Sequence, residues 1–389
     1  MPFPSTQALP LDGITVVALE HAVAAPFATR QLADLGARVI KVERPGVGDF
    51  AREYDRSVHG QSSYFVWLNR GKESVELDLK SDADRGVLDL MIESADVLVQ
   101  NLLPGAVDRL GLDAHTLRAR RPDLIHCSIS GYGTGGPFTD KKAYDLLVQC
   151  ESGLLSITGS PEEPAKVGVS VVDIATGTYA YSGILAALYE RERTGVGATL
   201  SVSMLEAVGE WMMQPTYRSV YGERPFVRTG ARHASIAPYG PYRALDGTVF
   251  IGVQSDREWE ILCREVLGRP DLVEEDRFAR NTERVAHDAL ITDVIEGALA
   301  HQRADDVIRV LEQRGLACAR MRTPQEFHDH PQLEARDRWR EVQSPGGPVR
   351  ALLPPVVIEG REAAMGDVPA LGQHTEALRR EFASGVEKA

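Results

Sequence analysis

The sequence predicts an α/β protein with a doubly wound parallel sheet and a second, smaller α+β domain. One reason is that strand-like, helix-like and strand-like segments follow one another near the start, which is the pattern of a βαβ unit. A second is that this alternation continues as far as Ser203. The third is the length of 389 residues, which exceeds what one compact core usually covers.

The first βαβ unit follows a short proline-rich lead. Residues 14–19 are a compact, β-branched run that predicts a buried strand. Residues 24–35 have helical apolar spacing, with Pro26 in the first turn and Gly36 at the end. Residues 38–43 again have the composition of a strand, so the two strands should pair in parallel.

The same alternation predicts the rest of the large sheet. Further strands are expected at 74–79, 96–100, 124–129 and 198–203, with helices at 82–94, from Pro104, at 173–192 and at 205–217. The helix at 173–192 is rich in alanine and glycine. Small residues permit close approach of a neighbouring backbone, so this helix is expected to be central and buried.

The second half of the chain changes character. Residues 221–236 are irregular and rich in Arg, Gly and Pro, which indicates a linker. Beyond them, a strand at 249–253 and helices of mixed charge predict a smaller α+β unit, the helices lying at 258–267, 281–300 and 304–314. The tail is extended and turn-rich until a closing helix near 375–382.

Charge and composition exclude several classes of protein. Lys and Arg total 43 against 56 Asp and Glu, a net charge of -13, so nucleic acid and membrane surfaces are poor partners. No apolar run reaches the roughly 18 residues of a membrane span, and the N-terminus lacks a secretory pattern. The four cysteines form no CxxC pair, so we expect no metal site and a cytoplasmic protein.

Several enzyme signatures are missing. We find no GxxxxGK(S/T), HExxH or GxSxG motif, and the turn at 20–26 lacks the glycines that a dinucleotide pyrophosphate needs. Cations do gather near the predicted strand ends, namely Arg44, Arg70, Lys72, Arg109 and Lys142. Ligands of open parallel sheets bind at that edge, so the set could hold a phosphorylated ligand. Each cation taken singly is better explained as solvated surface charge.

Two acidic positions could carry chemistry. Asp173 lies between an apolar run at 167–172 and the small-residue helix. A carboxylate there is either a helix cap or an anionic nucleophile, and the spacing alone favours the cap. Tyr144 and Asp145 are either an acid/base pair or a buried tyrosine beside a capping aspartate.

The chain resembles the class III coenzyme A transferases, which include formyl-CoA transferase, carnitine CoA-transferase and several dicarboxylate CoA-transferases. The resemblance runs nearly end to end. It rests on six segments in order: 35–46 with 48–49, 69–78, 100–111, 144–149, 167–173 and 183–191.

The resemblance implies the site residues. The nucleophilic aspartate of the family falls on Asp173. The CoA contacts of the family fall on Ala22, Ala24, Arg44, Leu77, Asn101, Arg109 and Lys142. Coenzyme A thioester would be a substrate, with no permanently bound cofactor and no metal.

The resemblance also implies a domain organisation. A Rossmann-like large domain would span 1–205 and be completed by 335–389. A linker at 206–235 would lead to a small domain at 236–323, and a return linker would follow at 324–334. Two chains of the family thread through each other as interlocked rings, so a homodimer is expected.

The implied chemistry conserves acyl activation. The Asp173 carboxylate would attack the donor acyl-CoA, giving a mixed anhydride and the CoA thiolate. The thiolate, held nearby, would convert the anhydride into an aspartyl-CoA thioester. An acceptor carboxylate would then reverse these steps, with backbone N–H groups around the nucleophile as the simplest oxyanion stabilisers.

Two departures bear on the acceptor acid. Formyl-CoA transferase has a glutamine in its first turn and a tetraglycine loop, whereas this chain has Val23 and no run of four glycines, which argues against formyl-CoA and oxalate. The segment 228–240 resembles that of members acting on mesaconate, itaconate, citramalate, malate or succinate. Arg232 and His233 could grip a distal carboxylate, or the segment packs at a dimer interface. Val23 and Tyr144 complete the expected substrate contacts.

Two other functions are compatible with the same fold. An α-methylacyl-CoA racemase needs a His-Asp pair, but the His position here is Tyr144, and a neutral phenol is a poor base near pH 7. A non-catalytic CoA-binding protein is the second alternative, and the presence of Asp173 argues against it.

Overall fold

The computed structural model describes residues 8–222 and 226–383, and it divides into two compact units. Unit 1 contains the described residues of Met1–Gly153, Val167–Thr216 and Leu333–Ala389. Unit 2 contains those of Leu154–Lys166 and Tyr217–Gln332. Neither unit is therefore one continuous piece of chain.

Unit 1 is built on a six-stranded sheet whose paired neighbours all run parallel. Its strands are β1 (Thr15–Leu19), β2 (Arg38–Glu43), β3 (Lys72–Glu76), β4 (Val97–Gln100), β5 (Ile125–Ser130) and β6 (Thr199–Ser203). The order is β3-β2-β1-β4-β5-β6, which reverses between β1 and β4. The expected parallel α/β architecture is confirmed, and open sheets of this kind bind ligands where the strand order reverses, which here is at the carboxyl ends of β1 and β4.

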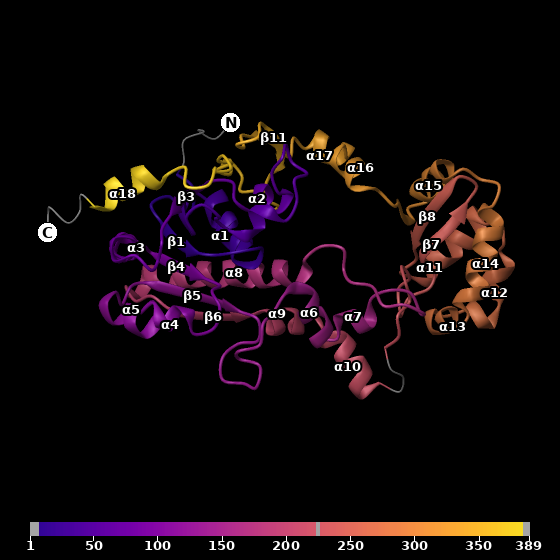
Figure 1. Cartoon of the computed structure of the whole chain (residues 1–389). Helices are drawn as coiled ribbons and strands as arrows, with labels where there is room; N and C mark the ends of the chain where they lie inside the picture. The colour runs from indigo at the N-terminus through magenta and orange to yellow at the C-terminus, as the bar shows by residue number, and fades with distance from the viewer. Residues whose placement is uncertain (1–7, 223–225, 384–389) are drawn as a thin grey trace. The chain divides into compact units, whose positions relative to one another are not determined.

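Helices cover both faces of this sheet (Figure 1). One face is covered by α1 (Ala24–Asp34) and α8 (Val171–Thr194). The other is covered by α3 (Asp82–Ser94), α5 (Ala114–Arg120) and the closing helix α18 (Thr375–Ala383). The C-terminal segment thus contributes core side chains to a sheet made by the first half of the chain.

The helices α1 and α8 approach each other very closely at Gly177. A Cβ placed on Gly177 would lie 2.5 Å from the carbonyl oxygen of Ala24, so no larger residue fits without movement. The helix α8 is also the one candidate, among the described residues, that could cross a membrane by length and composition. Its buried residues pack against α1 and the sheet, as in the core helix of a folded domain.

Smaller elements complete unit 1. They are η1 (Phe50–Glu53), α2 (Ser63–Leu68), α4 (Ala106–Arg109), α6 (Asp145–Glu151), α9 (Met204–Trp211), the first part of α10 (Met213–Tyr221), most of α17 (Pro331–Ala335) and the hairpin of β10 (Trp339–Val342) and β11 (Val349–Leu352). Much of the segment 206–235, expected as linker, is therefore helical. Met204, Ala207 and Val208 are buried, which explains why α9 packs as a helix there.

Unit 2 contains a three-stranded antiparallel sheet in the order β7-β8-β9. The strands are β7 (Tyr239–Ala244), β8 (Gly247–Gly252) and β9 (Ala317–Arg320). The helices are α7 (Leu154–Ile157), α11 (Asp256–Ile261), the π-turn η2 (Leu262–Val266), α12 (Asp271–Glu274), η3 (Asp276–Phe278), α13 (Asn281–Ala286), α14 (Asp288–Leu299), α15 (Ala304–Gln313) and α16 (Pro324–His328). The apolar side chains of β7, β8, α11, η2, α12, η3, α14 and α15 form one core around Tyr242, Trp259 and Phe278.

The segment 154–166 belongs to unit 2, although the sequence analysis placed it in the large domain. The guanidinium of Arg228 explains the association. It donates hydrogen bonds to the carbonyl oxygens of Ser160, Ser156 and Pro161 at 2.8, 3.3 and 3.1 Å.

Candidate active site

Asp173 lies in the first turn of α8, close to where the helix begins. Its side chain is half-buried, and no other described residue forms a hydrogen bond or ion pair with its carboxylate. Burial, followed by the negative charge of Asp145, raises the pKa of Asp173 to about 7. A carboxyl group with a pKa near 7 and no ion-pair partner among the described residues is unusual, and it is therefore a functional-site candidate.

The cap of α8 is Asp145, which comes from the first turn of α6. Its Oδ1 accepts the backbone N–H of Val172 at 2.8 Å and that of Asp173 at 3.2 Å. The cap interpretation of Asp173 was therefore wrong, and the cap interpretation of Asp145 is confirmed. The neighbouring Tyr144 is not buried as expected, because 61% of it is exposed.

Gln149 holds the capping carboxylate in place. Its side-chain amide donates to Oδ2 of Asp145 at 2.6 Å, while its Oε1 accepts the backbone N–H of Val167 at 3.1 Å. Gln149 is fully buried, so this link between α6 and the approach to α8 is shielded from water. The start of α8 is fixed on two sides as a result.

The backbone N–H groups at the start of α8 are engaged from Val171 to Ile174. Besides those of Val172 and Asp173, the N–H of Val171 is bonded to Val169 and that of Ile174 to Ser170. Backbone N–H groups around Asp173 are the oxyanion stabilisers expected from the sequence, and these four donate to other acceptors in the structure.

The first βα turn lies at the carboxyl end of β1, where the strand order of the sheet reverses. The backbone N–H of His21 donates to Oδ1 of Asn101 at 2.9 Å, and Nδ2 of Asn101 donates to the His21 carbonyl at 2.9 Å. This pair ties the end of β1 to the end of β4. Ala22 follows with a left-handed φ of 62°, which a residue with a side chain rarely adopts. Ala24 then begins α1, and the side chain of Val23 is buried beneath the turn.

Asp49 supports the unusual conformation of Ala22. Its Oδ1 accepts the N–H of Ala22 at 3.1 Å, and its Oδ2 pairs with Nζ of Lys41 at 2.9 Å. Lys41 also pairs with Glu20 at 3.3 Å, and all three charged side chains are buried. Burial lowers the pKa of Lys41, but the charges of Asp49 and Glu20 outweigh it and leave that pKa above its usual value.

Two of the five strand-end cations are not available to a ligand. Lys72 is buried and pairs with Glu20 at 2.7 Å, and Arg70 is buried and pairs with Asp34 at 2.7 Å. The remaining three, Arg44, Arg109 and Lys142, are exposed and have no ion-pair partner among the residues that the structure describes. Only these three could meet external phosphates.

Leu77 directly follows β3. Its side chain is 1% exposed and belongs to the core, and its N–H donates to the carbonyl of Glu43 at 3.0 Å. Contact with a ligand would therefore use its carbonyl oxygen. This hydrogen bond joins the ends of β2 and β3, and it places Leu77 next to Glu43, the residue before Arg44.

A series of aromatic contacts runs from the first turn to Tyr54, whose pKa is affected by the charge of Asp173. His21 stacks on Phe50 at 5.7 Å between ring centroids, Phe50 contacts Tyr54 at 5.8 Å, and Tyr54 meets Tyr64 edge-on. Burial, followed by the charges of Asp49 and Asp173, raises the pKa of Tyr54 to about 12. Phe50 and Tyr54 are not among the site residues expected from the sequence. Their i, i+4 spacing after Gly48 and Asp49 is the one pattern that could have indicated them.

Arg232 and His233 lie in unit 2 and are engaged there. The guanidinium of Arg232 donates to the Pro241 carbonyl at 3.0 Å, pairs with Asp288 at 3.6 Å and lies over the ring of Tyr242. The His233 ring stacks on Tyr239 at 5.2 Å. These contacts hold both side chains within unit 2.

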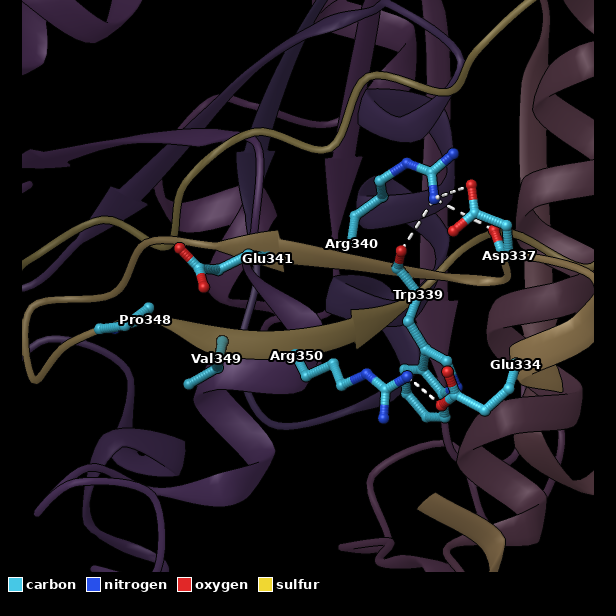
Figure 2. Close-up of a pocket in the computed structure, with 8 residues that line it drawn as sticks. All are labelled: Glu334, Asp337, Trp339, Arg340, Glu341, Pro348, Val349 and Arg350. Atoms are coloured by element: carbon cyan, nitrogen blue, oxygen red, sulfur yellow. Dashed lines mark hydrogen bonds and ion pairs between the residues drawn. The ribbon is translucent and has the colours of Figure 1, made fainter. Parts of the chain in front are cut away.

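An open pocket of about 410 Å³ lies on the β10–β11 hairpin of unit 1 (Figure 2). It contains none of the expected site residues. Its two guanidinium groups are paired, Arg340 with Asp337 and Arg350 with Glu334. Within the described ranges, no cluster of three His, Cys, Asp or Glu side chains could hold a metal ion.

The model of CoA-transferase family III matches residues 11–375. The chain is 38% identical over 387 residues to acetyl-CoA:oxalate CoA-transferase of Acetobacter aceti, covering 97% of each chain. It is 34% identical over 392 residues to succinyl-CoA:mesaconate CoA-transferase of Haloarcula hispanica, again covering 97% of each.

Solved structures agree with these matches. A CaiB/BaiF family protein from Brucella suis superposes with a TM-score of 0.86 at 32% identity, covering 97% of this chain and all of that one. Rv3272 of Mycobacterium tuberculosis gives a TM-score of 0.85 at 31% identity, covering 96% and 100%. From its core sheet to its closing helix, this chain belongs to CoA-transferase family III and is a CoA-transferase.

Proposed function

We propose that the chain moves coenzyme A from an acyl-CoA thioester to a small dicarboxylic acid by covalent catalysis at Asp173. The observation that carries this proposal is the unpaired Asp173 carboxylate with a pKa of about 7. A carboxylate with a pKa near 7 is partly ionised at neutral pH and more basic than an ordinary aspartate, which favours attack on an acyl carbon.

The steps balance without water. An Asp173 oxygen attacks the thioester carbon, the C–S bond breaks, and CoA leaves as a thiolate while a mixed anhydride forms. The thiolate attacks Cγ of Asp173 and expels the donor carboxylate, leaving an aspartyl-CoA thioester. The acceptor carboxylate attacks Cγ, again releasing the thiolate, which then takes the acceptor acyl group and restores the Asp173 carboxylate.

Coenzyme A would lie along the carboxyl edge of the sheet. The three exposed cations, Arg44, Arg109 and Lys142, would meet its phosphates. The turn of Ala22 and Ala24, the Leu77 carbonyl and the Asn101 side chain would contact the rest of the molecule. Holding the thiolate there provides the proximity that its return to Asp173 requires.

The acceptor class rests on the names of relatives. They act on glutarate, mesaconate and citramalate, and the Acetobacter aceti enzyme is named for oxalate. Oxalate therefore belongs with the C4 and C5 diacids in any test, although the tetraglycine run is missing here. Val23 and Tyr144 would border the acyl group. Arg232 and His233 would act on a distal carboxylate only if Arg232 left Asp288.

The chain would work as an interlocked homodimer in the cytoplasm. Support comes from large apolar side chains left exposed where the chain passes between the units, including Trp211 at 49% and Tyr221 at 82%. The absence of paired cysteines in the sequence fits a reducing compartment. Mass measurement by light scattering should give twice 42.6 kDa.

A covalent-adduct experiment tests the proposal. Incubation with succinyl-CoA and no acceptor should leave CoA attached to the peptide that contains Asp173, detected by mass spectrometry. Asp173→Ala should lose the adduct and all transfer, yet still bind CoA. Transfer to a dicarboxylate by Asp173→Ala would refute the assignment of the nucleophile.

The same samples address the two alternatives. Exchange of the α-proton of a 2-methylacyl-CoA for deuterium would indicate a racemase, and CoA binding with neither reaction would indicate a non-catalytic protein. The Asp145 carboxylate is engaged as a helix cap, so it is poorly placed for proton transfer in a racemase.

A further inference from the structure

The position of Asp173 in α8 poses a problem for a nucleophile. The first N–H groups of a helix have no partner within the helix, and they attract the nearest carboxylate. An aspartate in the first turn is well placed to fold back onto these groups, and the helix dipole adds to the attraction. A carboxylate held in that way would be a weaker base and would point at its own helix.

Asp145 removes both attractions. Its Oδ1 accepts the N–H groups of Val172 and Asp173 themselves, so they are no longer open to the Asp173 side chain. Its negative charge offsets the positive end of α8. Its second oxygen is bonded to buried Gln149, which keeps the carboxylate aimed at the helix.

We propose that Asp145 is a positioning residue for the nucleophile: by occupying the start of α8, its carboxylate keeps the Asp173 carboxylate detached from its own helix and available to the acyl carbon. The inference deepens the proposed function and rests on it. It also explains why the N–H groups of Val172 and Asp173 are engaged: they bind the Asp145 carboxylate and are therefore not available to bind that of Asp173.

The charged surroundings of Asp173 agree with this role. Asp145 of α6 is the one charged group whose effect on the pKa of Asp173 is resolved, and it acts in the same direction as burial. The other titratable groups linked electrostatically to this neighbourhood act on Tyr54, at the end of η1; besides Asp173 they are Asp49, Tyr144 and Tyr64. None of these groups is a cation.

Two substitutions separate charge from capping. Asp145→Asn keeps an amide oxygen on the N–H groups but removes the charge, so the acid limb of kcat/KM for adduct formation should move down by roughly one pH unit. Asp145→Ala removes the cap as well, and Asp173 should then turn onto its helix. Adduct formation at pH 8 should fall about tenfold or more, with CoA affinity changed less than about twofold.

A matched control is available at α5. Asp113 caps that helix by accepting the N–H of Thr116 at 2.9 Å, on an exposed surface. Asp113→Asn and Asp113→Ala should leave the pH profile and the adduct rate unchanged. A wild-type profile and rate in both Asp145 variants, each shown to be folded by its melting curve, would overturn the inference.

A second readout keeps the inference separate from the proposed function. The Asp173 carboxyl can be titrated by ¹³C NMR, with Asp173→Asn identifying its signal. Asp145→Asn should lower the pKa of that signal, whether or not transfer occurs. An unmoved pKa refutes the inference even if wild-type protein forms the adduct, whereas a missing wild-type adduct refutes the proposed function.

Discussion

Asp173 combines two properties that are unusual together in a carboxylate, since it is only half-buried and yet its pKa is raised to about 7. Burial and a like charge raise its pKa, while the cations of the neighbourhood are consumed elsewhere. Lys41 and Lys72 pair with Asp49 and Glu20 and do not reach the nucleophile. Both lysines are thus paired and buried near the first turn, and the Asp173 carboxylate has no ion-pair partner among the described residues.

The raised pKa sets the pH dependence of transfer. Protonated Asp173 is not a nucleophile, so kcat/KM for adduct formation should rise with pH and reach half its maximum near pH 7. Single-turnover measurements from pH 5 to 9 check this. A midpoint near 4, the value of an ordinary aspartate, would contradict the environment described for this side chain.

The same raised pKa means that the ionised Asp173 side chain lowers the free energy of unfolding at high pH. A folded-state pKa above the unfolded one stabilises the protein below about pH 4, and this contribution is lost as the pH rises through 7. Because the side chain is half-buried, we discount the full effect and expect Asp173→Asn to add about 1–2 kcal/mol to the unfolding free energy at pH 8.

Chemical denaturation at several pH values measures that gain. It should shrink toward pH 5, where wild-type Asp173 is protonated and resembles asparagine. Asp113→Asn should give no gain, because hydrogen bonds to Thr116 lower the pKa of Asp113. An equal gain for Asp173→Asn at pH 5 and pH 8 would show that charge is not the cause.

The sequence reveals these residues unevenly. Spacing places Asp173 in a first helical turn but cannot show whether it caps the helix, because the competing cap, Asp145, comes from another helix. The resemblance to a family assigns a role to Asp173 without explaining its reactivity. Phe50 and Tyr54 were missed because they form a single i, i+4 pair in an irregular segment, and one such spacing does not indicate which side chains face a site.

At the scale of elements, the candidate site depends on the contact between α1 and α8. The helix α1 follows the first turn, α8 carries Asp173, and Gly177 lets their backbones meet. The strands and helices around them were predicted well, because apolar runs and a helical repeat are local signals. The helix 82–94 begins and ends where the sequence indicates.

Gly177→Ala should therefore destabilise the protein, although alanine favours helices by about 1 kcal/mol over glycine. The new methyl group would collide with the Ala24 carbonyl, and we expect a net loss of about 1–3 kcal/mol with slower adduct formation. Gly183→Ala is the control, since its Cβ would meet only Leu200 at an ordinary 3.6 Å. A stabilising Gly177→Ala would refute the close contact.

Some elements carry no such local signal. The strand β7 contains Gly240 and Pro241, and β9 has only four residues, most of them exposed. Both form because β8 lies between them and pairs with each. A strand that is specified by its partner more than by its own side chains is not visible to a pattern search.

At the scale of the whole molecule, unit 1 is completed by the last helix of the chain. Leu378 and Phe382 of α18 join the core formed by α3 and the sheet, and Arg38 of β2 pairs with Glu381 at 2.7 Å. The fold of the large unit therefore depends on residues that are hundreds of positions apart.

Leu378→Ala should cost about 2–4 kcal/mol, because it leaves a cavity in this core. Hydrogen exchange should accelerate in β3 and α3, with unit 2 amides unchanged. Leu245→Ala, at an exposed position in unit 2, should have little effect on either unit. Uniform acceleration in both units after Leu378→Ala would show that they unfold together.

The chain passes between its two units at Gly153–Leu154, Lys166–Val167, Thr216–Tyr217 and Gln332–Leu333. During synthesis on a ribosome, the strands of the large sheet emerge long before α18 is translated. The part of α3 and of the sheet face that Leu378 and Phe382 cover then remains exposed until the polypeptide is nearly finished, and chaperones bind intermediates with apolar surface of this kind. A single proteolytic nick in one crossing segment would also leave the two units tethered by the others.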